Sequence, residues 1–345
     1  MLATPKKVLV ALSGGVDSSV CVHLLKEQGY EVHCVVLCMS DAHDETVEAA
    51  KDAASSLNVP LEVVDMKAEF ERDVISYFIE EYKNGRTPNP CIVCNPKVKF
   101  HALVETANRL GCELIATGHY ARLQQDGEYT LLLRGESLKR DQSYMLYRLT
   151  QRELSRLMFP LAELEKPYVR EIAASLGLSC ATKPDSQENC FIEDNDYAGY
   201  IERRIGKMKT GNFISPEGTV CGKHKGILHY TVGQRKGLGI ALGRPVFVKE
   251  INPKTNQIIL ANKGDDLYED TIITKVTTIN GIPFEAPFEA QVKIRSTAIP
   301  TQATIIPIDE VTARVVFETP QRAVAKGQSL VIYDGDVVLG GGFIS

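Results

Sequence analysis

The segment that most constrains the fold, residues 7–29, changes character once, at a loop rich in serine and glycine. Residues 7–12 form a short apolar run preceded by charge, which is typical of a strand covered on both faces. Residues 20–25 carry valine and leucine at helical spacing, and Gly29 lies where the helix would end. A buried strand followed by a helix predicts an α/β domain whose connecting loop lies at the edge of a parallel sheet.

The loop itself, residues 13–18 with the sequence SGGVDS, has the composition of an anion-binding site. We expect Gly14 and Gly15 to adopt positive φ and to let a ligand approach the backbone, while the first N–H groups of the helix point at it. The Walker loop is excluded because its Gly-Lys-Ser/Thr ending is missing, and the spacing does not match the dinucleotide pattern G-x-G-x-x-G. A Ser-Gly-Gly turn without its flanking residues is as often a purely structural turn.

The complete string SGGVDSS after a strand is more specific, and it resembles the pyrophosphate loop of the ATP pyrophosphatases. Such enzymes split ATP into AMP and pyrophosphate and adenylate an oxygen of their substrate. The resemblance implies that Ser13, Ser18 and the backbone of the two glycines hold the leaving pyrophosphate, and that Asp17 acts through Mg²⁺. The ATP-binding residues implied here are Ala11, Leu12, Ser13, Gly14, Gly15, Val16, Asp17 and Ser18.

The chain has 345 residues, which exceeds one ordinary domain and predicts two or three. An apolar content of 44% and a charged content of 24% are typical of an ordered globular protein. No apolar run approaches membrane-spanning length and the N-terminus lacks an apolar signal core, so we expect no membrane partner and a cytoplasmic protein. Nine irregularly spaced cysteines then indicate reduced thiols rather than a disulfide framework.

The net charge of −5 argues against a nucleic-acid partner, but the distribution of charge is uneven. Residues 203–236 contain eight Lys or Arg and one acidic residue, Glu217. Such a block is either a solvated face or the place where an RNA backbone docks. The basic residues are Arg203, Arg204, Lys207, Lys209, Lys223, Lys225, Arg235 and Lys236.

Strands alternate with helices up to about residue 206. Strands are predicted at residues 32–37, 61–64 and 113–116, and helices at 44–57, 69–82, 97–110 and 167–176. Residues 129–134 are expected to form a hairpin arm. Residues 84–96 carry three prolines, which we expect to be excluded from regular structure, and therefore predict a rigid loop between two helices.

Beyond residue 206 the sequence changes to short β-like runs separated by Gly, Pro and Asn. Alternating apolar and polar residues at 290–295 and 312–317 predict a small β-barrel at the C-terminus. We therefore divide the chain into an α/β catalytic domain at 1–206, a small basic central domain at 207–267 and a C-terminal β-barrel at 268–345.

Two short polar motifs follow predicted strands. The sequence Thr-Gly-His-Tyr occupies residues 117–120, where Gly118 permits the close approach of a nucleotide and His119 would point into the same site. The alternative for His119 is a histidine whose hydrogen bonds are satisfied within the core. Asp141 and Ser143 similarly lie where helix caps belong, so simple capping is an alternative to any role in binding.

The cysteines divide into three groups by context. Cys21, Cys34 and Cys112 lie in apolar helix or strand sequences and are expected in the core. The contexts of Cys38, Cys180 and Cys221 are ambiguous. Cys91, Cys94 and Cys190 lie in predicted polar loops, the first two as C-x-x-C, which fits half a zinc site, a redox pair or part of an iron–sulfur site.

Motifs along the whole chain together resemble the tRNA 2-thiouridylases and follow that family's order. They are the phosphate loop, GRTPNP at 85–90, CN at 94–95, TGHY at 117–120, DQSY at 141–144, CFI at 190–192, GQRKGLG at 233–239 and LGGG at 339–342. The resemblance implies an ATP-pyrophosphatase domain, also called adenine nucleotide alpha hydrolase-like, a small central domain and a C-terminal β-barrel. It also implies a transferase that activates the C2 oxygen of the wobble uridine of tRNA with ATP and displaces AMP with sulfur.

The resemblance also implies roles for individual residues. A thiol-borne sulfur attacks C2, for which accessible cysteines of low pKa are expected. In the family's persulfide scheme Cys190 carries the sulfur and Cys94 releases it by forming a disulfide, while adenine rests near Leu37 and Gly118. The tRNA-contacting positions carried over are Asn89, Pro90, Cys91, His119, Arg140, Asp141, Gln142, Arg295, Ser296 and Gln328.

Cys91 departs from the commoner family pattern, in which many members have Asp at this position. With Cys91 the chain resembles the family's cluster-binding variant, in which three thiolates hold a [4Fe–4S] cluster and leave one iron open to an external sulfide. This favours Cys91, Cys94 and Cys190 as cluster ligands over the persulfide scheme. The implied sulfur donor is a sulfur-relay protein, a cysteine desulfurase or inorganic sulfide. Leu37 stands where Met is usual, which weakens the adenine contact expected there.

Two functions of other classes stay open at this point. Another ligase with a pyrophosphate loop, such as an amidotransferase, should lack both paired loop cysteines and a C-terminal barrel. A nucleotide-sensing RNA-binding protein should keep its function after loss of Cys94 or Cys190.

Overall fold

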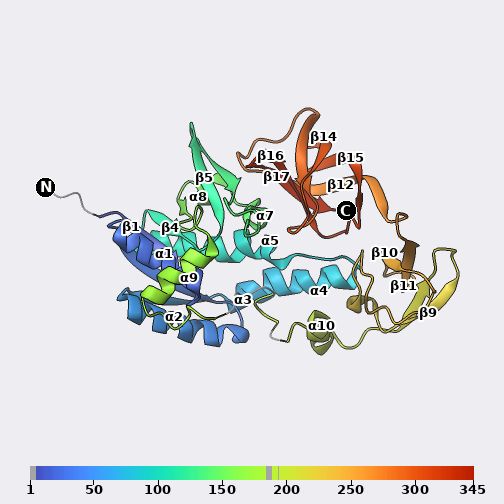
Figure 1. The fold of residues 1–345 in the computed structure, drawn as a ribbon, viewed down its shortest axis with the longest axis horizontal. Helices are drawn as coiled ribbons and strands as arrows, with labels where there is room; N and C mark the ends of the chain where they lie inside the picture. The colour runs from blue at the N-terminus through green and yellow to red at the C-terminus, as the bar shows by residue number, and fades with distance from the viewer. Residues whose placement is uncertain (1–4, 184–188, 193) are drawn as a thin grey trace.

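The computed structural model describes residues 5–183, 189–192 and 194–345 and contains three β-sheets in that part of the chain. Figure 1 shows an α/β layer structure at the N-terminal end, a small sheet near β10 and β11, and a barrel that contains the C-terminus. The predicted fold class, a parallel-sheet domain followed by a small domain and a β-barrel, is therefore confirmed.

The first sheet is parallel throughout, with strand order β3-β2-β1-β4-β7. Its strands are β1 (Lys7–Ala11), β2 (Glu31–Cys38), β3 (Leu61–Asp65), β4 (Leu114–Ala116) and β7 (Leu157–Met158). One face carries α1 (Val16–Glu27), α2 (Asp44–Leu57) and α9 (Lys166–Ser175). The other carries α3 (Lys67–Phe70), α4 (Ser76–Lys83), α5 (Pro90–Cys94) and α6 (Phe100–Leu110).

The alternation of side chains along β1 explains why helices cover both faces. Val8 and Val10 pack with α1 and α2, whereas Leu9 packs with α6 on the opposite face, and all three are fully buried. Successive residues of a strand point to opposite faces, so a continuous apolar run requires two apolar layers. The strand order reverses between β1 and β4, and the crevice beyond these two carboxyl ends is where α/β sheets bind ligands.

The prediction of a rigid loop at 84–96 is wrong for its second half. There α5 begins at Pro90 and continues through a π-helical turn, Asn95–Lys99, into α6. Pro90 is tolerated because it occupies the first helical position, where an N–H would lack a partner. Pro96 lies in the π-helical turn, whose widened backbone accommodates a residue that cannot donate to the carbonyl four residues earlier. A second π-helical turn, Glu71–Ile75, joins α3 to α4 and packs against α5.

The central sheet has the order β10-β11-β8-β9. Its strands are β8 (Gly211–Ile214), β9 (Val220–His224), β10 (Val246–Asn252) and β11 (Gln257–Asn262), and α10 (Tyr197–Ile205) precedes them. They close over a separate small core around Phe213 and Val248. Short 3₁₀ turns at Asp41–His43 and Ile227–His229 complete the N-terminal and central parts.

The C-terminal strands form a closed six-stranded barrel, because the order β12-β15-β14-β13-β16-β17 is completed by pairing of β12 with β17. These strands are β12 (Leu267–Thr278), β13 (Phe288–Lys293), β14 (Thr301–Asp309), β15 (Thr312–Arg322), β16 (Ser329–Asp334) and β17 (Val337–Ile344). The predicted hairpin, β5 (Ala121–Asp126) and β6 (Tyr129–Arg134), adds to this sheet where Leu133 pairs with Val337. Figure 1 shows it standing beside the barrel.

The largest hydrophobic core crosses from the first domain into the barrel. Tyr144 and Tyr147 from α7 (Ser143–Leu146) and the turn after it are fully buried with Val331 and Tyr333 of β16. The tyrosine hydroxyls bond to Ser329, at 2.7 Å to its carbonyl and 3.0 Å to its Oγ. The short helix α8 (Gln151–Leu154) packs beside β6. Among the described residues no helix is long and apolar enough to cross a membrane.

Candidate active site

The phosphate loop joins β1 to α1 and is shaped by one glycine rather than two. Gly14 has φ +70°, and a Cβ added there would lie 2.3 Å from the backbone carbon of Ala49 in α2. Gly15 has φ −83° and caps α1, so the prediction that both glycines adopt positive φ is wrong for Gly15. Only the first position needs a left-handed backbone, because Gly15 is the N-cap of α1 and has an extended conformation that any residue can adopt.

The two serines of this loop bond to each other. The backbone N–H of Ser13 donates to Ser18 Oγ at 3.1 Å, the two hydroxyl oxygens lie 3.2 Å apart, and Ser18 Oγ donates to the Gly15 carbonyl at 3.2 Å. Ser13 is exposed, whereas Ser18 is buried beneath the first turn of α1. The loop therefore presents one hydroxyl and the N-terminus of α1 outward, the arrangement that binds an anion.

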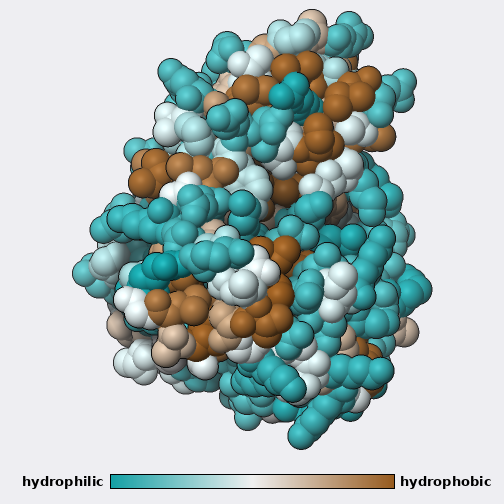
Figure 2. Space-filling view, turned by 90° about the vertical axis from the view of Figure 1, so that its right-hand side faces the viewer, coloured by the Kyte–Doolittle hydropathy of each residue, from teal (hydrophilic) through white to brown (hydrophobic). Residues whose placement is uncertain are grey.

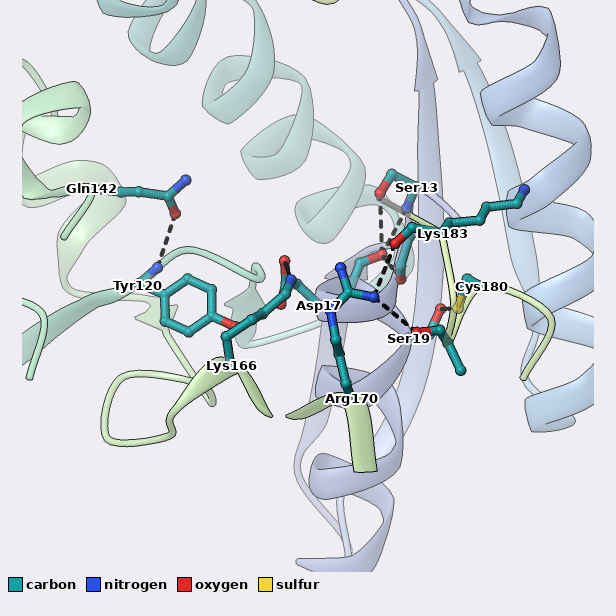
Figure 3. A network of polar contacts seen from close by, with 12 residues as sticks. Ser13, Asp17, Ser19, Tyr120, Gln142, Lys166, Arg170, Cys180 and Lys183 are labelled. Carbon is teal, nitrogen blue, oxygen red and sulfur yellow. Dashed lines mark hydrogen bonds and ion pairs between the residues drawn. The ribbon is translucent and has the colours of Figure 1, made fainter. Parts of the chain in front are cut away.

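Both oxygens of the Asp17 carboxylate have partners, as Figure 3 shows. The Tyr120 hydroxyl donates to Oδ1 at 2.7 Å, and Lys166 Nζ lies 2.6 Å from Oδ2. Lys166 opens α9 with its side chain only 7% exposed, so its ammonium is shielded from water, whereas the Asp17 side chain is 32% exposed. Lys166 was missed by the sequence analysis because nothing local connects positions 17 and 166.

The segment after β4 is built against the phosphate loop. A Cβ added at Gly118 would lie 3.0 Å from Asp17 Cβ and 3.2 Å from Ser18 N, so this glycine is required by the protein's own packing. Tyr120 follows, and its backbone is tied to Gln142 by two hydrogen bonds, one of 3.0 Å to the Gln142 side chain and one of 2.9 Å from the Gln142 N–H. A continuous chain of bonds thus joins Gln142 to Asp17 (Figure 3).

His119 follows Gly118 and packs against Phe100 at the start of α6, the helix that continues from α5. Its Nδ1 is 2.7 Å from Thr117 Oγ1, its ring stacks on Phe100 with centroids 5.9 Å apart, and Phe159 meets it edge-on at 6.0 Å. Burial, with a smaller contribution from the Lys99 charge, lowers the pKa of His119 to about 3. The imidazole is therefore neutral at physiological pH and offers stacking and hydrogen bonding rather than charge.

Three cysteines lie near one another at the π-helical end of α5. Cys94 is buried with its Sγ 3.9 Å from Met39 Sδ, whereas Cys91 and Cys190 have exposed side chains. Cys190 is fixed by the next residue, Phe191, whose ring packs edge-on against Phe70, at 5.5 Å between centroids. The expectation that Cys91 and Cys94 lie in a loop is wrong, because both are helical.

The expected low pKa of these thiols is not what the structure gives. Burial raises the pKa of Cys94 to about 12. Cys91 and Cys190 are exposed as residues, but the protein packed around their sulfurs raises the pKa of Cys190 to about 11 and that of Cys91 as well. The Lys99 ammonium lowers the pKa of all three thiols, whereas Cys91 raises the pKa of Cys94 and of Cys190, and Cys190 raises that of Cys94. Desolvation dominates for each thiol and outweighs both the Lys99 charge and a backbone hydrogen bond that lowers the pKa.

The three thiols are also the candidate ligands for a metal or an iron–sulfur cluster. Three thiols are the soft ligands that iron–sulfur clusters need. Within the described ranges, however, no group of three His, Cys, Asp or Glu lies at a spacing that would hold a metal ion. The thiols are close enough to influence one another's pKa values, but they do not form a preassembled ligand set.

The remaining thiols are structural. Cys21, Cys34 and Cys112 are buried, as expected, and Cys38 and Cys180 are buried as well. Cys221, in the central domain, is partly exposed. All nine cysteines are free thiols, in agreement with the expectation of reduced cysteines.

Several residues expected to contact tRNA have their functional groups bound within the protein. The Asp141 carboxylate is 2% exposed and accepts from the N–H groups of Gly135 and Ser143. Gln328 Nε2 donates to the Thr87 carbonyl at 2.8 Å. A guanidinium nitrogen of Arg295 donates to the carbonyls of Val232 and Ala323, at 3.2 and 2.6 Å, and so bridges the central domain and the barrel.

The other carried-over positions differ in accessibility. Gln142 is exposed, and Asn89, Arg140 and Ser296 are partly exposed. Pro90 is buried at the start of α5. Of the nucleotide positions, Ala11 is partly exposed, whereas Leu12, Val16 and Leu37 are buried, Leu37 with 8% of its surface exposed.

Most of the Lys and Arg side chains in the basic block at 203–236 form no ion pair in the described part of the chain. Arg203 lies 3.3 Å from Asp194 and Arg204 lies 2.6 Å from Glu71. The other six have exposed side chains and no carboxylate within 4.0 Å among the described residues; they are Lys207, Lys209, Lys223, Lys225, Arg235 and Lys236. Figure 2 shows that the end of the molecule facing this view is largely hydrophilic, with separate apolar patches.

Lys99, His43 and Met39 also belong to the site and were not found from the sequence. His43 is buried, its Nδ1 lies 2.8 Å from Ser40 Oγ, and burial lowers its pKa, with the Lys99 charge adding to the effect. Of these three, only Lys99 could have been found from the sequence, because it follows the C-x-x-C motif on the same continuous helix. The predicted loop at 84–96 separated the motif from Lys99.

The parallel sheet, the Ser-Gly-Gly loop that joins β1 to α1 and the glycine after β4 define a nucleotide-binding domain of the ATP-pyrophosphatase class. Three family models match the chain in order. They are a tRNA methyl transferase HUP domain at 6–194, a tRNA methyl transferase PRC-barrel domain at 198–262 and an aminomethyltransferase beta-barrel domain at 269–344.

Similar proteins identify the family within that class. A tRNA-specific 2-thiouridylase of Clostridium botulinum (strain Langeland) is 46% identical over 349 aligned positions, which cover 98% of each chain. Another, of Clostridioides difficile (strain 630), is 45% identical over 355 positions and again covers 98% of each. The chain belongs to the tRNA-specific 2-thiouridylase family. A 4-thiouridine synthetase–RNA complex with bound ATP superposes on 54% of this chain and 45% of that chain with a TM-score of 0.36 and 20% identity, too partial a likeness to support a conclusion.

Proposed function

We propose that this protein catalyses the ATP-dependent 2-thiolation of the wobble uridine of tRNA. The observation that carries the proposal is the position of residues 118–119. Gly118 packs on the phosphate loop at Asp17, and His119 stacks against Phe100 on the helix that continues from Cys94. A pyrimidine placed beside His119 would have the ATP-binding loop on one side and the thiols on the other.

The phosphate loop would perform the activation step. The uridine C2 oxygen attacks the α-phosphorus of ATP, and the bond to the β-phosphate oxygen breaks to release pyrophosphate. The exposed Ser13 hydroxyl and the N-terminus of α1 are suited to stabilise that leaving group, because its negative charge develops where the helix dipole is positive. Adenylation converts a poor leaving oxygen into AMP.

Asp17 would contribute through its two fixed partners. Asp17 is the residue that would hold Mg²⁺, and the ion would supply positive charge to the phosphates. The Tyr120 hydroxyl and the Lys166 ammonium hold the carboxylate at the N-terminal turn of α1, so its orientation is set before the nucleotide arrives. Lys166 also places a shielded positive charge beside the expected phosphate position.

Sulfur transfer would then be the task of Cys91, Cys94 and Cys190. In the persulfide route the terminal sulfur of a Cys190 persulfide attacks C2, and AMP departs with the former C2 oxygen. Cys94 next attacks the Cys190 Sγ, which breaks the sulfur–sulfur bond, leaves sulfur on the base and forms a disulfide that an external thiol reduces. The terminal sulfur is supplied beforehand by a sulfur-relay protein or a cysteine desulfurase.

The alternative is that the three cysteines hold a [4Fe–4S] cluster that receives sulfide. Cys91 supports this route, because it supplies the third thiol. The described residues are not arranged at metal-ligand spacing, so cluster binding requires the thiols to move together. Anaerobic purification followed by an iron count distinguishes the routes: an iron-free protein that still thiolates tRNA with a persulfide donor contradicts the cluster.

The tRNA would dock on the basic block of the central domain and on the adjoining barrel. Six exposed cations there are free to neutralise phosphates. Gln142 and Asn89 lie nearer the thiols and would contact the anticodon end. A cytoplasmic location fits a protein whose substrates are tRNA and ATP and whose thiols are all free.

The test is Cys94→Ser, with Cys221→Ser as the matched control in the central domain. We expect thiolation to fall by at least about 100-fold in Cys94→Ser, because no other group replaces the thiol, while ATP binding stays unchanged. Mass spectrometry of the digested tRNA separates 2-thiouridine from methylated uridine, the product suggested by the names of two family models. Undiminished thiolation, or a methylated product, would overturn the proposal.

A further inference from the structure

The loop of residues 84–89 lies where the three parts of the chain meet. It follows α4, which in Figure 1 runs beneath the barrel toward β10, and it leads directly into α5 with Cys91 and Cys94. Because only six residues separate α4 from α5, anything that fixes this loop also fixes the start of the cysteine helix.

The central sheet contacts the loop at Gly85. This glycine has φ +67°, and a Cβ added to it would lie 3.0 Å from both Cγ2 and the carbonyl oxygen of Ile251 in β10 and 3.3 Å from Pro253. No side chain fits in that space without moving β10. The close approach therefore holds the loop against the central domain.

The barrel holds the loop at Thr87. The Thr87 N–H donates to the Lys326 carbonyl at 2.8 Å, and the Thr87 carbonyl accepts from Gln328 Nε2 at 2.8 Å. Gly327, between these two, would place an added Cβ 2.9 Å from Arg86 Cβ and 3.1 Å from the Thr87 nitrogen. Both backbone groups of one loop residue are thus bound by a single barrel turn, residues 326–328.

The cysteine helix is also held at its other end by a segment that docks on the same part of the barrel. Asn89 caps α5 by accepting from the Cys91 N–H at 3.1 Å, and Asn95 Nδ2 donates to the Met145 carbonyl at 2.7 Å. Met145 belongs to α7, whose Tyr144 hydroxyl bonds to the carbonyl of Ser329 at 2.7 Å. Residues 326–329 of the barrel therefore support α5 from both sides.

We propose that Gln328 is a positioning residue for sulfur transfer, which through its hydrogen bond to Thr87 sets where the Cys91–Cys94 helix lies. The inference rests on the proposed function and replaces the expected role of Gln328 as a tRNA contact. It makes the placement of the thiols depend on the docking of the barrel. A tRNA bound across the barrel would act on the cysteines through the same loop.

The test compares Gln328→Glu with Gln302→Glu. The glutamate keeps the shape of Gln328 but cannot donate to the Thr87 carbonyl at neutral pH. Gln302 is exposed on β14 of the same barrel, and its side chain makes no hydrogen bond in the described part of the chain, so it controls for the added charge. Gln328→Ala repeats the measurement without a charge if the glutamate variant does not fold.

The first readout is alkylation of individual cysteines by iodoacetamide, followed by peptide mass spectrometry. We expect Cys94 in Gln328→Glu to react about threefold faster than in the parent, because the helix that buries it opens more often. Cys221 serves as the internal reference and should not change. This measurement needs neither ATP nor tRNA, so it stands even if the protein performs another reaction.

The second readout is steady-state thiolation. We expect kcat to fall about tenfold in Gln328→Glu while KM for tRNA stays within about twofold, since a small displacement of a reacting group slows chemistry without weakening binding. Unchanged Cys94 alkylation in a folded Gln328→Glu variant would overturn the proposal. A raised KM with kcat and alkylation unchanged would also overturn it, and would return Gln328 to the tRNA-contacting set.

Discussion

The phosphate loop and the cysteine helix contribute to one site but are built in opposite ways. The loop is closed by bonds between residues at most five positions apart, from Ser13 to Ser18. The cysteine helix is positioned by bonds that span 50 and 241 positions, to α7 and to the barrel. The turn of the phosphate loop is local and its Asp17 is held by Tyr120 and Lys166 of the same domain, whereas the cysteine helix depends on packing between domains.

This difference predicts how each half fails. A change in the loop should damage nucleotide binding directly and be confined to the first sheet. A change at a domain contact should leave nucleotide binding intact and disturb the thiols. Substitutions at Gly14, His119 and Lys99 test the phosphate loop, the site histidine and the thiols in turn.

The largest effect is expected for Gly14→Ala. The added Cβ would lie 2.3 Å from the Ala49 backbone carbon, and φ +70° is unfavourable for alanine. We expect the free energy of unfolding to fall by about 3 kcal/mol and ATP binding to be lost, because α1 and α2 must separate. Thermal unfolding and nucleotide titration measure both.

Gly29→Ala is the matched control for that prediction. It has a similar φ, +83°, but nothing lies within 4 Å of the added Cβ. We expect a cost of about 1 kcal/mol from the backbone alone, with ATP binding retained. Equal losses in the two variants would show that Gly14 is required for its φ and not for its packing against α2.

His119 should make the free energy of unfolding depend on pH. The folded-state pKa of His119, lowered to about 3, lies below the ordinary value of 6.5, so the unfolded chain binds a proton that the folded chain excludes. Stability is unaffected by this group above pH 6.5 and falls as the pH drops from 6.5 toward 3. In His119→Phe, we expect the loss of stability between pH 7 and pH 5 to be smaller by about 1–2 kcal/mol.

Urea unfolding at the two pH values measures this difference. His101→Phe, on the exposed side of α6, controls for the loss of an imidazole. An unchanged pH dependence in His119→Phe would mean that His119 has the same pKa in the folded and the unfolded chain, which would contradict its lowering by burial.

The smallest effect is expected for Lys99→Met, which acts on the thiols of Cys94 and Cys190. The Lys99 charge lowers the pKa values of Cys94 and Cys190 against the dominant effect of burial, so its removal should raise both. We expect alkylation of these thiols at pH 8 to slow by about threefold and the pH profile to move upward. Lys97→Met, which removes a cation lying 3.9 Å from Asp73, is the control and should leave both thiols unchanged.

The sequence predicted local structure well and contacts between distant segments poorly. The strand at 7–12, the helix at 44–57 and the barrel alternation at 312–317 were predicted correctly, because period and turn chemistry are local. The helix at Pro90 was missed because three prolines indicate a break, whereas Pro90 takes the first helical position and Pro96 a π-helical turn.

The site was predictable only where the sequence carries it in one piece. Residues 13–18 could be identified from their string, but Lys166, which fixes Asp17, comes from another helix and has no neighbouring signal. The low pKa expected for the thiols could not be corrected without the structure, since burial is set by Met39, Phe191 and α7 together. The bonds of Gln328 and Arg295 likewise appear only once the domains are docked.

The pairing of β6 with β17 has a consequence for the order in which the protein is made. The ribosome delivers the chain N-terminus first, and β6 emerges about 200 residues before its partner β17, which ends one residue before the C-terminus. Until then one edge of β6 lacks its partner, and Tyr144 and Tyr147 lack the contacts with Val331 and Tyr333 that complete their burial. We therefore expect a chain cut before β16 to expose an unpaired strand edge and apolar surface, and to be more prone to aggregation and proteolysis.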